Sequence, residues 1–208
     1  MTADVATATG RTAPGRREKA AHLLSELFAP WVCAAVLPPV VGAVSDTPWW
    51  RGLLLGLMTA VFSAGIPYLL ILHGVRRGAL TDRHVSRRKD RPMFLGITVA
   101  LVLLSLVLAR LLGGPPELTA LIAAMMACAA IGALVSLRWK LSMHTVVLAG
   151  SMAALFVVLG PWVGVLLVLV LAVAWARVVL RSHTSAQVAV GAVVGAVTAG
   201  LIMTVSSA

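Results

Sequence analysis

Histidines accompanied by arginine or lysine occur in three segments of this chain, and such side chains suit phosphoryl transfer. Guanidinium groups bind phosphate oxygens through paired hydrogen bonds and stabilise charge on a transferring phosphoryl group. One imidazole can attack phosphorus while another protonates the leaving alkoxide. Backbone amides at a helix start add anion donors. The residues concerned are His84, Arg88 and Arg91 in the first segment, Lys140, Ser142 and His144 in the second, and Arg177, His183 and Gln187 in the third.

The composition places these segments in a membrane protein. Of the 208 residues, 60% are hydrophobic and 12% are charged, whereas a soluble domain has about 45–50% apolar and about 25% charged residues. A water-soluble core of this size cannot bury such an excess, so it must face lipid. The two cysteines lie inside apolar stretches and form neither a disulfide framework nor a metal-ligand spacing. We therefore expect an all-α fold without a metal or another cofactor.

Seven stretches are apolar enough to cross roughly 30 Å of hydrocarbon, which takes about 20 helical residues. They predict a polytopic helical membrane bundle of about six or seven transmembrane helices. Residues 27–208 would form one transmembrane domain, after a basic, flexible N-terminal tail of residues 1–26 that becomes helical from Arg16 onward. Pro38 and Pro39 predict a bend in the first span, which a bundle tolerates if neighbours satisfy the freed carbonyls. The stretches are Leu27–Val44, Gly52–His73, Met93–Leu112, Leu118–Leu137, Ser142–Val158, Trp162–Val179 and Ala186–Val205.

The positive charge falls on one side of this bundle. All of the 17 Lys and Arg residues except Arg51 and Arg110 lie in the tail or in alternate loops on that side. Short loops rich in Lys and Arg stay in the cytoplasm, so the basic side is predicted to be the cytoplasmic face of an inner or plasma membrane. In this setting a basic surface attracts anionic lipids and phosphorylated ligands rather than nucleic acid. The small-residue face of the last span, which includes Gly191 and Gly195, indicates close helix packing and would also permit a homo-oligomer.

The three segments resemble the three signatures of the type 2 phosphatidic acid phosphatase superfamily, whose integral-membrane members dephosphorylate lipid phosphates. The resemblance covers about residues 83–195, in the order of the family. Three positions differ, because His84 stands for a lysine, Met143 for a glycine and Gln187 for an aspartate. The matched pairs are His84-x6-Arg91-Pro92 with Lys-x6-Arg-Pro, Leu141-Ser142-Met143-His144 with Pro-Ser-Gly-His, and Ala176-Arg177-x5-His183-x3-Gln187 with Ser-Arg-x5-His-x3-Asp.

The resemblance implies a role for each matched residue. His183 would be the nucleophile, and His144 would be the general acid for the leaving lipid alkoxide. Gln187 would take the place of the orienting aspartate and accept a hydrogen bond from Nδ1–H of His183, although it cannot stabilise an imidazolium by charge. The phosphate-binding residues would be Arg91, Arg177, Ser142, His84, Arg88 and Lys140.

These roles predict a metal-independent phosphatase that acts on a membrane lipid phosphate, or on an isoprenoid or polyprenyl phosphate or diphosphate, through a phosphohistidine intermediate. Two alternatives stay open because of the three differing positions. One is an enzyme of the same fold that uses its diphosphate pocket for prenyl transfer or terpene cyclisation. The other is a non-catalytic membrane protein that binds a lipid phosphate.

Overall fold

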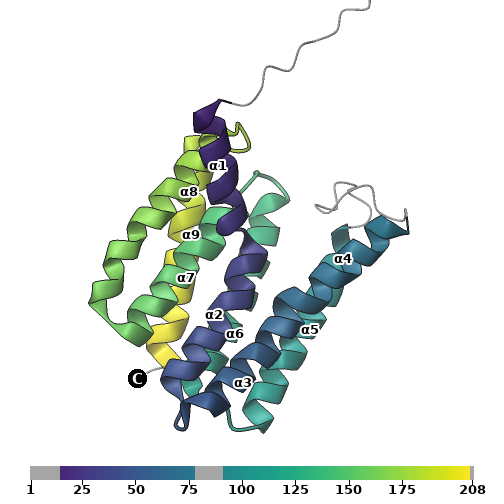
Figure 1. Ribbon diagram of the computed structural model, residues 1–208, viewed down its shortest axis with the longest axis vertical. Helices are drawn as coiled ribbons and strands as arrows, with labels where there is room; N and C mark the ends of the chain where they lie inside the picture. Colours follow the sequence, from purple (N-terminus) through teal and green to yellow (C-terminus); the bar gives the residue numbers. More distant parts are fainter. Residues whose placement is uncertain (1–14, 78–90, 207–208) are drawn as a thin grey trace, which may run out of the picture.

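The computed structural model describes residues 15–77 and 91–206, apart from the side chains of residues 91–95, and the secondary structure of these ranges is helical (Figure 1). A π-helix, η1, joins α3 to α4, and a 3₁₀-helix, η2, leads into α8. The elements are α1 (Arg16–Leu27), α2 (Pro30–Ser45), α3 (Trp49–Ala60), η1 (Val61–Gly65), α4 (Ile66–Arg76), α5 (Arg91–Leu111), α6 (Pro116–Ser136), α7 (Met143–Leu159), η2 (Pro161–Leu166), α8 (Leu167–Val179) and α9 (Ser185–Ser206).

The chain is an all-helical, multi-pass membrane protein. Within the described residues, four helical stretches are long and apolar enough to cross a membrane, and α1 with α2 makes a fifth if this pair, bent by 45°, is one span. Each of the seven predicted stretches coincides with helix. Two of these helices are shorter apolar segments, so the count of six or seven crossings depends on them. The four stretches are Trp49–Arg76, Pro116–Ser136, Pro161–Val179 and Ser185–Ser206, and the shorter segments are Gly96–Leu111 and Met143–Leu159.

The C-terminal part of the predicted tail is α1, which packs against α8. Ala21 and Ser25 are buried on its inner face. The guanidinium carbon of Arg17 lies 5.8 Å from the ring centroid of Trp175, within the range of a cation–π contact. The predicted helix from Arg16 onward is therefore confirmed, and α1 is part of the bundle. Residues 1–14 lie outside the described residues.

The two prolines of the first span lie inside α2, which continues through both of them. The bend lies earlier, between α1 and α2. Pro38 has no N–H with which to bond the carbonyl of Ala34, and Oγ of Ser63 in η1 donates to that carbonyl at 3.2 Å. A neighbouring helix thus satisfies the freed carbonyl, as a membrane bundle requires.

The α7 and α9 helices approach so closely that their backbones touch. A Cβ atom on Gly195 would overlap the carbonyl of Val146, and one on Gly191 would meet Oγ1 of Thr145. Only glycine permits this approach, so the predicted packing role of the small-residue face is confirmed. Its partner is α7 of the same chain. The contact holds the starts of α7 and α9 together, at the end of the bundle where α1 also lies (Figure 1).

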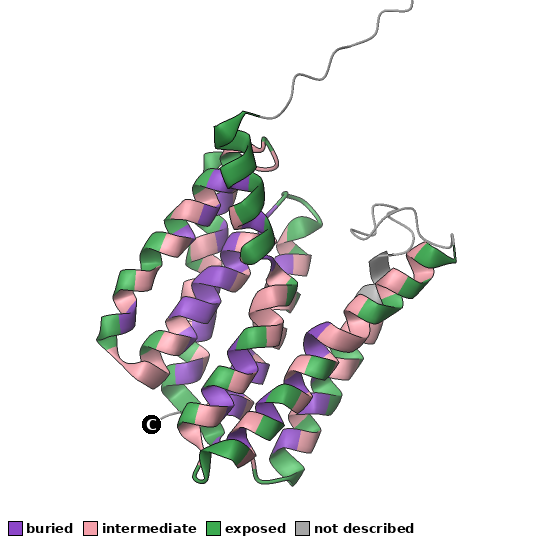
Figure 2. Cartoon of the chain, in the orientation of Figure 1, coloured by how far each residue is buried: buried purple, intermediate pink, exposed green. Residues whose placement is uncertain are grey.

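Burial is uneven across the bundle (Figure 2). A cluster of buried residues that includes Cys128, Val146 and Ala199 joins α6, α7 and α9, whereas α4 has no buried residue. Side chains such as Leu171, which is 70% exposed, cover the outer surface, as expected for lipid-facing residues. The helices that carry the second and third histidine segments are therefore the ones that a packed core holds in place.

Arg51 closes the end of the bundle opposite α1. Its Nη1 atom pairs with the carboxylate of Asp46 at 2.9 Å. Its Nη2 atom donates to the carbonyls of Leu112 and Gly113, each at 2.6 Å. One guanidinium thus ties the turn between α2 and α3 to the turn between α5 and α6.

Candidate active site

The end of α8 fixes the geometry between Arg177 and His183. Arg181 has a left-handed φ of 50°, and its N–H donates to the carbonyl of Val178 at 2.9 Å. The N–H of Ser182 donates to the carbonyl of Arg177 at 3.1 Å. These two bonds make a Schellman C-cap, and the N–H of His183 adds a third, to the same Arg177 carbonyl, at 3.3 Å. The spacing of five residues therefore folds His183 back onto the last turn of α8.

The start of α9 is a capping box that uses Gln187. The N–H of Gln187 donates to Oγ1 of Thr184 at 3.3 Å, and the N–H of Thr184 donates to Oε1 of Gln187 at 3.1 Å, as in the S/T-x-x-E/Q motif. The Gln187 side chain still interacts with His183, as predicted, but Nδ1 of His183 forms no hydrogen bond with it. That nitrogen is buried and has no hydrogen-bond partner in the described part of the chain, because Oε1 of Gln187 is directed to the helix start.

His183 lies among positive charges. Burial lowers the pKa of His183 below its ordinary value of 6.5, and the charges of Arg177 and Lys140 lower it further, against hydrogen bonding from the Gln187 side chain and the Lys140 backbone. Because its pKa is lowered, the imidazole is neutral near neutral pH and has a lone pair on one of its ring nitrogens. The buried and unpaired Nδ1 is the ring nitrogen considered below.

Ser142 stands at the N-cap of α7 without capping it through its side chain. The residue is fully buried, and its Oγ atom has no hydrogen-bond partner among the described residues. An N-cap serine normally accepts a bond from an amide of the first turn. Its carbonyl instead accepts a bond from Oγ1 of Thr145 at 3.0 Å. The hydroxyl is therefore left unused at the N-terminus of a helix.

Three atoms of the predicted site share this unpaired state. Of the five buried side-chain polar atoms without a partner in the described residues, three are Ser142 Oγ, Arg177 Nε and His183 Nδ1. Lys140 contacts His183 and lies two residues before Ser142, so the three side chains lie where α7, α8 and α9 meet. An unpaired buried polar group costs about 1–3 kcal/mol. Three such atoms at one place mark a candidate functional site.

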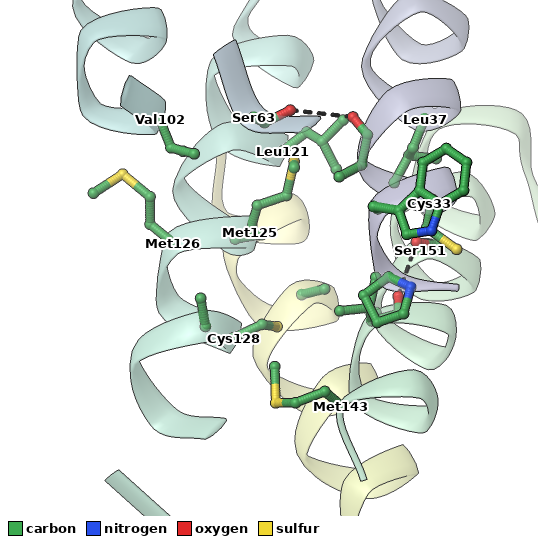
Figure 3. A pocket seen from close by; sticks show the side chains of 18 of the residues that line it. Cys33, Leu37, Ser63, Val102, Leu121, Met125, Met126, Cys128, Met143 and Ser151 are labelled. Atoms are coloured by element: carbon green, nitrogen blue, oxygen red, sulfur yellow. Dashed lines mark hydrogen bonds between the residues drawn. The ribbon is translucent and has the colours of Figure 1, made fainter. Parts of the chain in front are cut away.

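Met143, at the position of the family's glycine, packs into the bundle rather than toward α8. A Cβ atom on Gly132 of α6 would lie 2.7 Å from Sδ of Met143, so the absent side chain of Gly132 makes room for it. Met143 also lines an apolar cavity (Figure 3). His144, the second residue of α7, is half-buried. Sequence reasoning missed Gly132, because no motif connects it to residue 143.

The helix in which the first predicted segment ends, α5, packs apart from α8 and α9. The described part of α5, which begins at Arg91, packs mainly against α3, η1, α4 and α6 (Figure 1). The side chain of Arg91 is not described, and His84 and Arg88 lie outside the described residues. The structure thus unites Lys140, Ser142, Arg177, His183 and Gln187 but does not bring α5 to them.

Comparisons with protein-family models, with curated proteins and with solved structures found no match. Among the described residues, no three His, Cys, Asp or Glu side chains form a group that could hold a metal ion. The fold and the site define a helical membrane protein with a partly buried His, Arg and Ser cluster at one end. Its function is therefore inferred from these residues and their geometry.

Proposed function

We propose that this protein is a metal-independent phosphatase of a membrane lipid phosphate, or of an isoprenoid or polyprenyl phosphate or diphosphate. The observation that carries the proposal is the set of unpaired atoms on Ser142, Arg177 and His183. A hydroxyl and a guanidinium N–H are donors for phosphate oxygens. A neutral imidazole nitrogen is a nucleophile for phosphorus. A phosphoryl group would give all three a partner at once.

In the proposed reaction, the lone pair on Nδ1 of His183 attacks phosphorus. An N–P bond forms while the P–O bond to the lipid breaks, and His144 donates its proton to the leaving lipid oxygen. Water then attacks the phosphohistidine, His144 takes a proton from that water, and inorganic phosphate leaves. Arg177 and Lys140 offset the negative charge on the phosphoryl oxygens throughout.

The three unpaired atoms are buried, so a substrate reaches them only when a covering element moves. We take α1 to be that element. It packs on α8, and its Glu26 side chain interacts electrostatically with Arg177. A substrate phosphate would replace Glu26 as the anionic neighbour of Arg177.

The proposed orientation places this site on the cytoplasmic side of an inner or plasma membrane, with six or seven crossings. Support comes from the charge distribution, because all the Lys and Arg residues except Arg51 and Arg110 belong to segments on the side of the site. The partners would be the phosphorylated substrate and the surrounding lipids.

Phosphate release by the purified protein tests the proposal. The substrates would be phosphatidic acid, phosphatidylglycerophosphate, polyprenyl phosphates, and farnesyl and geranylgeranyl diphosphates, all with EDTA present. We expect release from at least one substrate, and its loss in His183→Ala. Release that survives in a folded His183→Ala protein would contradict the mechanism.

The capping box favours a second candidate, a non-catalytic lipid-phosphate-binding protein. Gln187 has a neutral amide instead of a carboxylate that could stabilise a charged His183, and its Oε1 accepts a bond from the N–H of Thr184. Saturable binding of a lipid phosphate without release of phosphate or of a rearranged hydrocarbon from any substrate would support this candidate over the phosphatase.

A further inference from the structure

An apolar cavity of about 300 Å³ lies inside the bundle (Figure 3). Residues of α2, η1, α5, α6, α7 and α9 line it, and most of them are apolar, such as Leu37, Leu121 and Cys128. The two serine hydroxyls in its wall are used by the backbone. Ser63 donates to the carbonyl of Ala34, and Ser151 donates to that of Val147 at 2.8 Å. The interior is therefore suited to hydrocarbon rather than to a polar ligand.

The cavity reaches the lipid-facing surface between α2 and α5. Trp31 of α2 is 48% exposed and Val99 of α5 is 42% exposed, and both line the cavity. Trp31 stacks on Tyr68 of α4, with ring centroids 5.4 Å apart. Figure 1 shows α4 and α5 leaning away from α2 toward the end of the bundle that carries the site. A chain could thus enter sideways from the bilayer, beside this aromatic pair.

One wall of the cavity ends at the residue that follows Ser142 of the proposed phosphate site. Met143, Val147, Gly150 and Ser151 line the cavity from one face of α7. That face extends about 12 Å along the helix axis. Met143 lies at the end of this face where α7 begins, and it directly follows Ser142, whose hydroxyl has no partner among the described residues. The sequence adjacency of Met143 and Ser142 is the observation that connects the cavity with the proposed site.

We infer that the cavity binds the single hydrocarbon chain of the phosphorylated substrate, an inference that rests on the proposed function. The volume is about twice that of the engineered 150 Å³ apolar cavity that holds benzene, which corresponds to roughly a dozen carbon atoms. One alkyl or prenyl chain of about this length fills the space, and a longer chain would extend through the mouth into the bilayer. The inferred substrate class is a single-chain alkyl or prenyl phosphate or diphosphate.

Photochemical labelling of the full chain in lipid nanodiscs tests this inference. The probe is dodecyl phosphate with a diazirine near the end of its chain, and labelled residues are located by mass spectrometry. We expect label on cavity residues of α6 and α7, such as Met125 and Val147. Ala129→Phe, which fills the cavity from α6, should abolish that label. Ala130→Phe is the matched control, because Ala130 is exposed and does not line the cavity.

A second pair of variants covers the case in which Ala129→Phe does not fold. Val99→Trp narrows the mouth from an exposed position, and Val107→Trp places the same side chain on α5 away from the cavity. Label should be lost in the first variant and kept in the second. Label spread over lipid-facing residues such as Leu171, and equal in both pairs, would overturn the inference.

Two further arms separate this inference from the proposed function. Unlabelled dodecyl phosphate should displace the probe, whereas dodecanol should not, and equal displacement by dodecanol would mean that the cavity holds any bilayer chain. In His183→Ala, the cavity label should persist although phosphate release is lost. Cavity label without turnover in the wild type would defeat the phosphatase alone, and turnover without cavity label would defeat the chain site alone.

Discussion

Two arginines at opposite ends of the bundle show different uses of the same side chain. Both terminal nitrogens of Arg51 have partners, which are a carboxylate and two backbone carbonyls. Arg177 has a buried Nε atom without a partner, in contact with His183, whose Nδ1 atom is also unpaired. Near Arg51 the corresponding unpaired atom is the isolated hydroxyl of Ser45.

This difference separates an end whose arginine is paired from an end where three buried polar atoms have no partner among the described residues. Hydrogen bonds from a charged group to its partners contribute about 1.5–3 kcal/mol each, so Arg51 stabilises the fold. The buried Nε atom of Arg177 forms no hydrogen bond within the described residues that would offset the free-energy cost of its desolvation. We interpret the end that carries Lys140, Arg177 and His183 as a region of lower stability that is kept for binding, as is common at functional sites.

The largest expected effect concerns the packing that holds the basic end together. Gly195→Leu should destabilise the protein by more than about 3 kcal/mol, because its Cβ would overlap the backbone of Val146. Gly200→Leu is the matched control, since the nearest atom to its Cβ is 4.0 Å away. Thermal unfolding in detergent would measure both. Equal stability of the two variants would contradict the backbone contact.

The arginine pair should separate activity from stability. Arg177→Ala should lower kcat by about 10²–10³-fold, as the loss of one transition-state donor does, with little loss of stability. Arg51→Ala should lower stability by about 2 kcal/mol and leave turnover per folded molecule unchanged. Phosphate release and thermal unfolding would be measured for both variants. Lost stability in Arg177→Ala, or lost turnover per folded molecule in Arg51→Ala, would contradict the comparison.

The pH dependence of turnover should report the charges around His183. Only neutral His183 is a nucleophile, and burial, Arg177 and Lys140 lower its pKa below 6.5. Activity should therefore be lost only as pH falls below 6.5. Lys140→Met removes one of these charges, so the acid limb of kcat/KM should move to higher pH. Lys19→Met, which alters a lysine of α1, should leave the limb in place, and an equal shift in both would exclude a local effect.

The smallest expected effect compares two unpaired serine hydroxyls. Ser142→Ala and Ser45→Ala should each raise stability by about 1 kcal/mol, because each removes a buried polar group that has no partner. Only Ser142→Ala should reduce phosphate release, by about three- to tenfold, the worth of one neutral hydrogen bond. Reduced release in Ser45→Ala as well would mean that the effect is not specific to the site.

The sequence predicted the features that depend on local pattern. Apolar runs predicted all seven helical stretches. Gly191 and Gly195 predicted close helix packing, but the sequence does not identify α7 as the partner helix. The relation of Arg177 to His183 followed from spacing, and the Schellman turn at Arg181 is its physical basis. The capping box of Thr184 and Gln187 also matches the sequence pattern T-x-x-Q, whereas the resemblance implied a different role for Gln187.

Features that depend on tertiary contacts could not be predicted in this way. The fit of Met143 against Gly132 joins two helices, and Ser63 meets the carbonyl of Ala34 only through the π-helix η1. The position of α5 away from α8 and α9 depends on packing against α3 and α6. The apolar cavity likewise exists only between helices that are distant in sequence.

Trapping of a phosphorylated intermediate is the most direct test of the central claim that the unpaired atoms form a phosphoryl-transfer site. The purified protein would be mixed with a radiolabelled prenyl or alkyl phosphate, quenched at alkaline pH and mapped by mass spectrometry. The account predicts phosphate on His183, reduced in Arg177→Ala and unchanged in Arg51→Ala. Turnover with phosphate on another residue, or neither turnover nor label with any substrate, would contradict it.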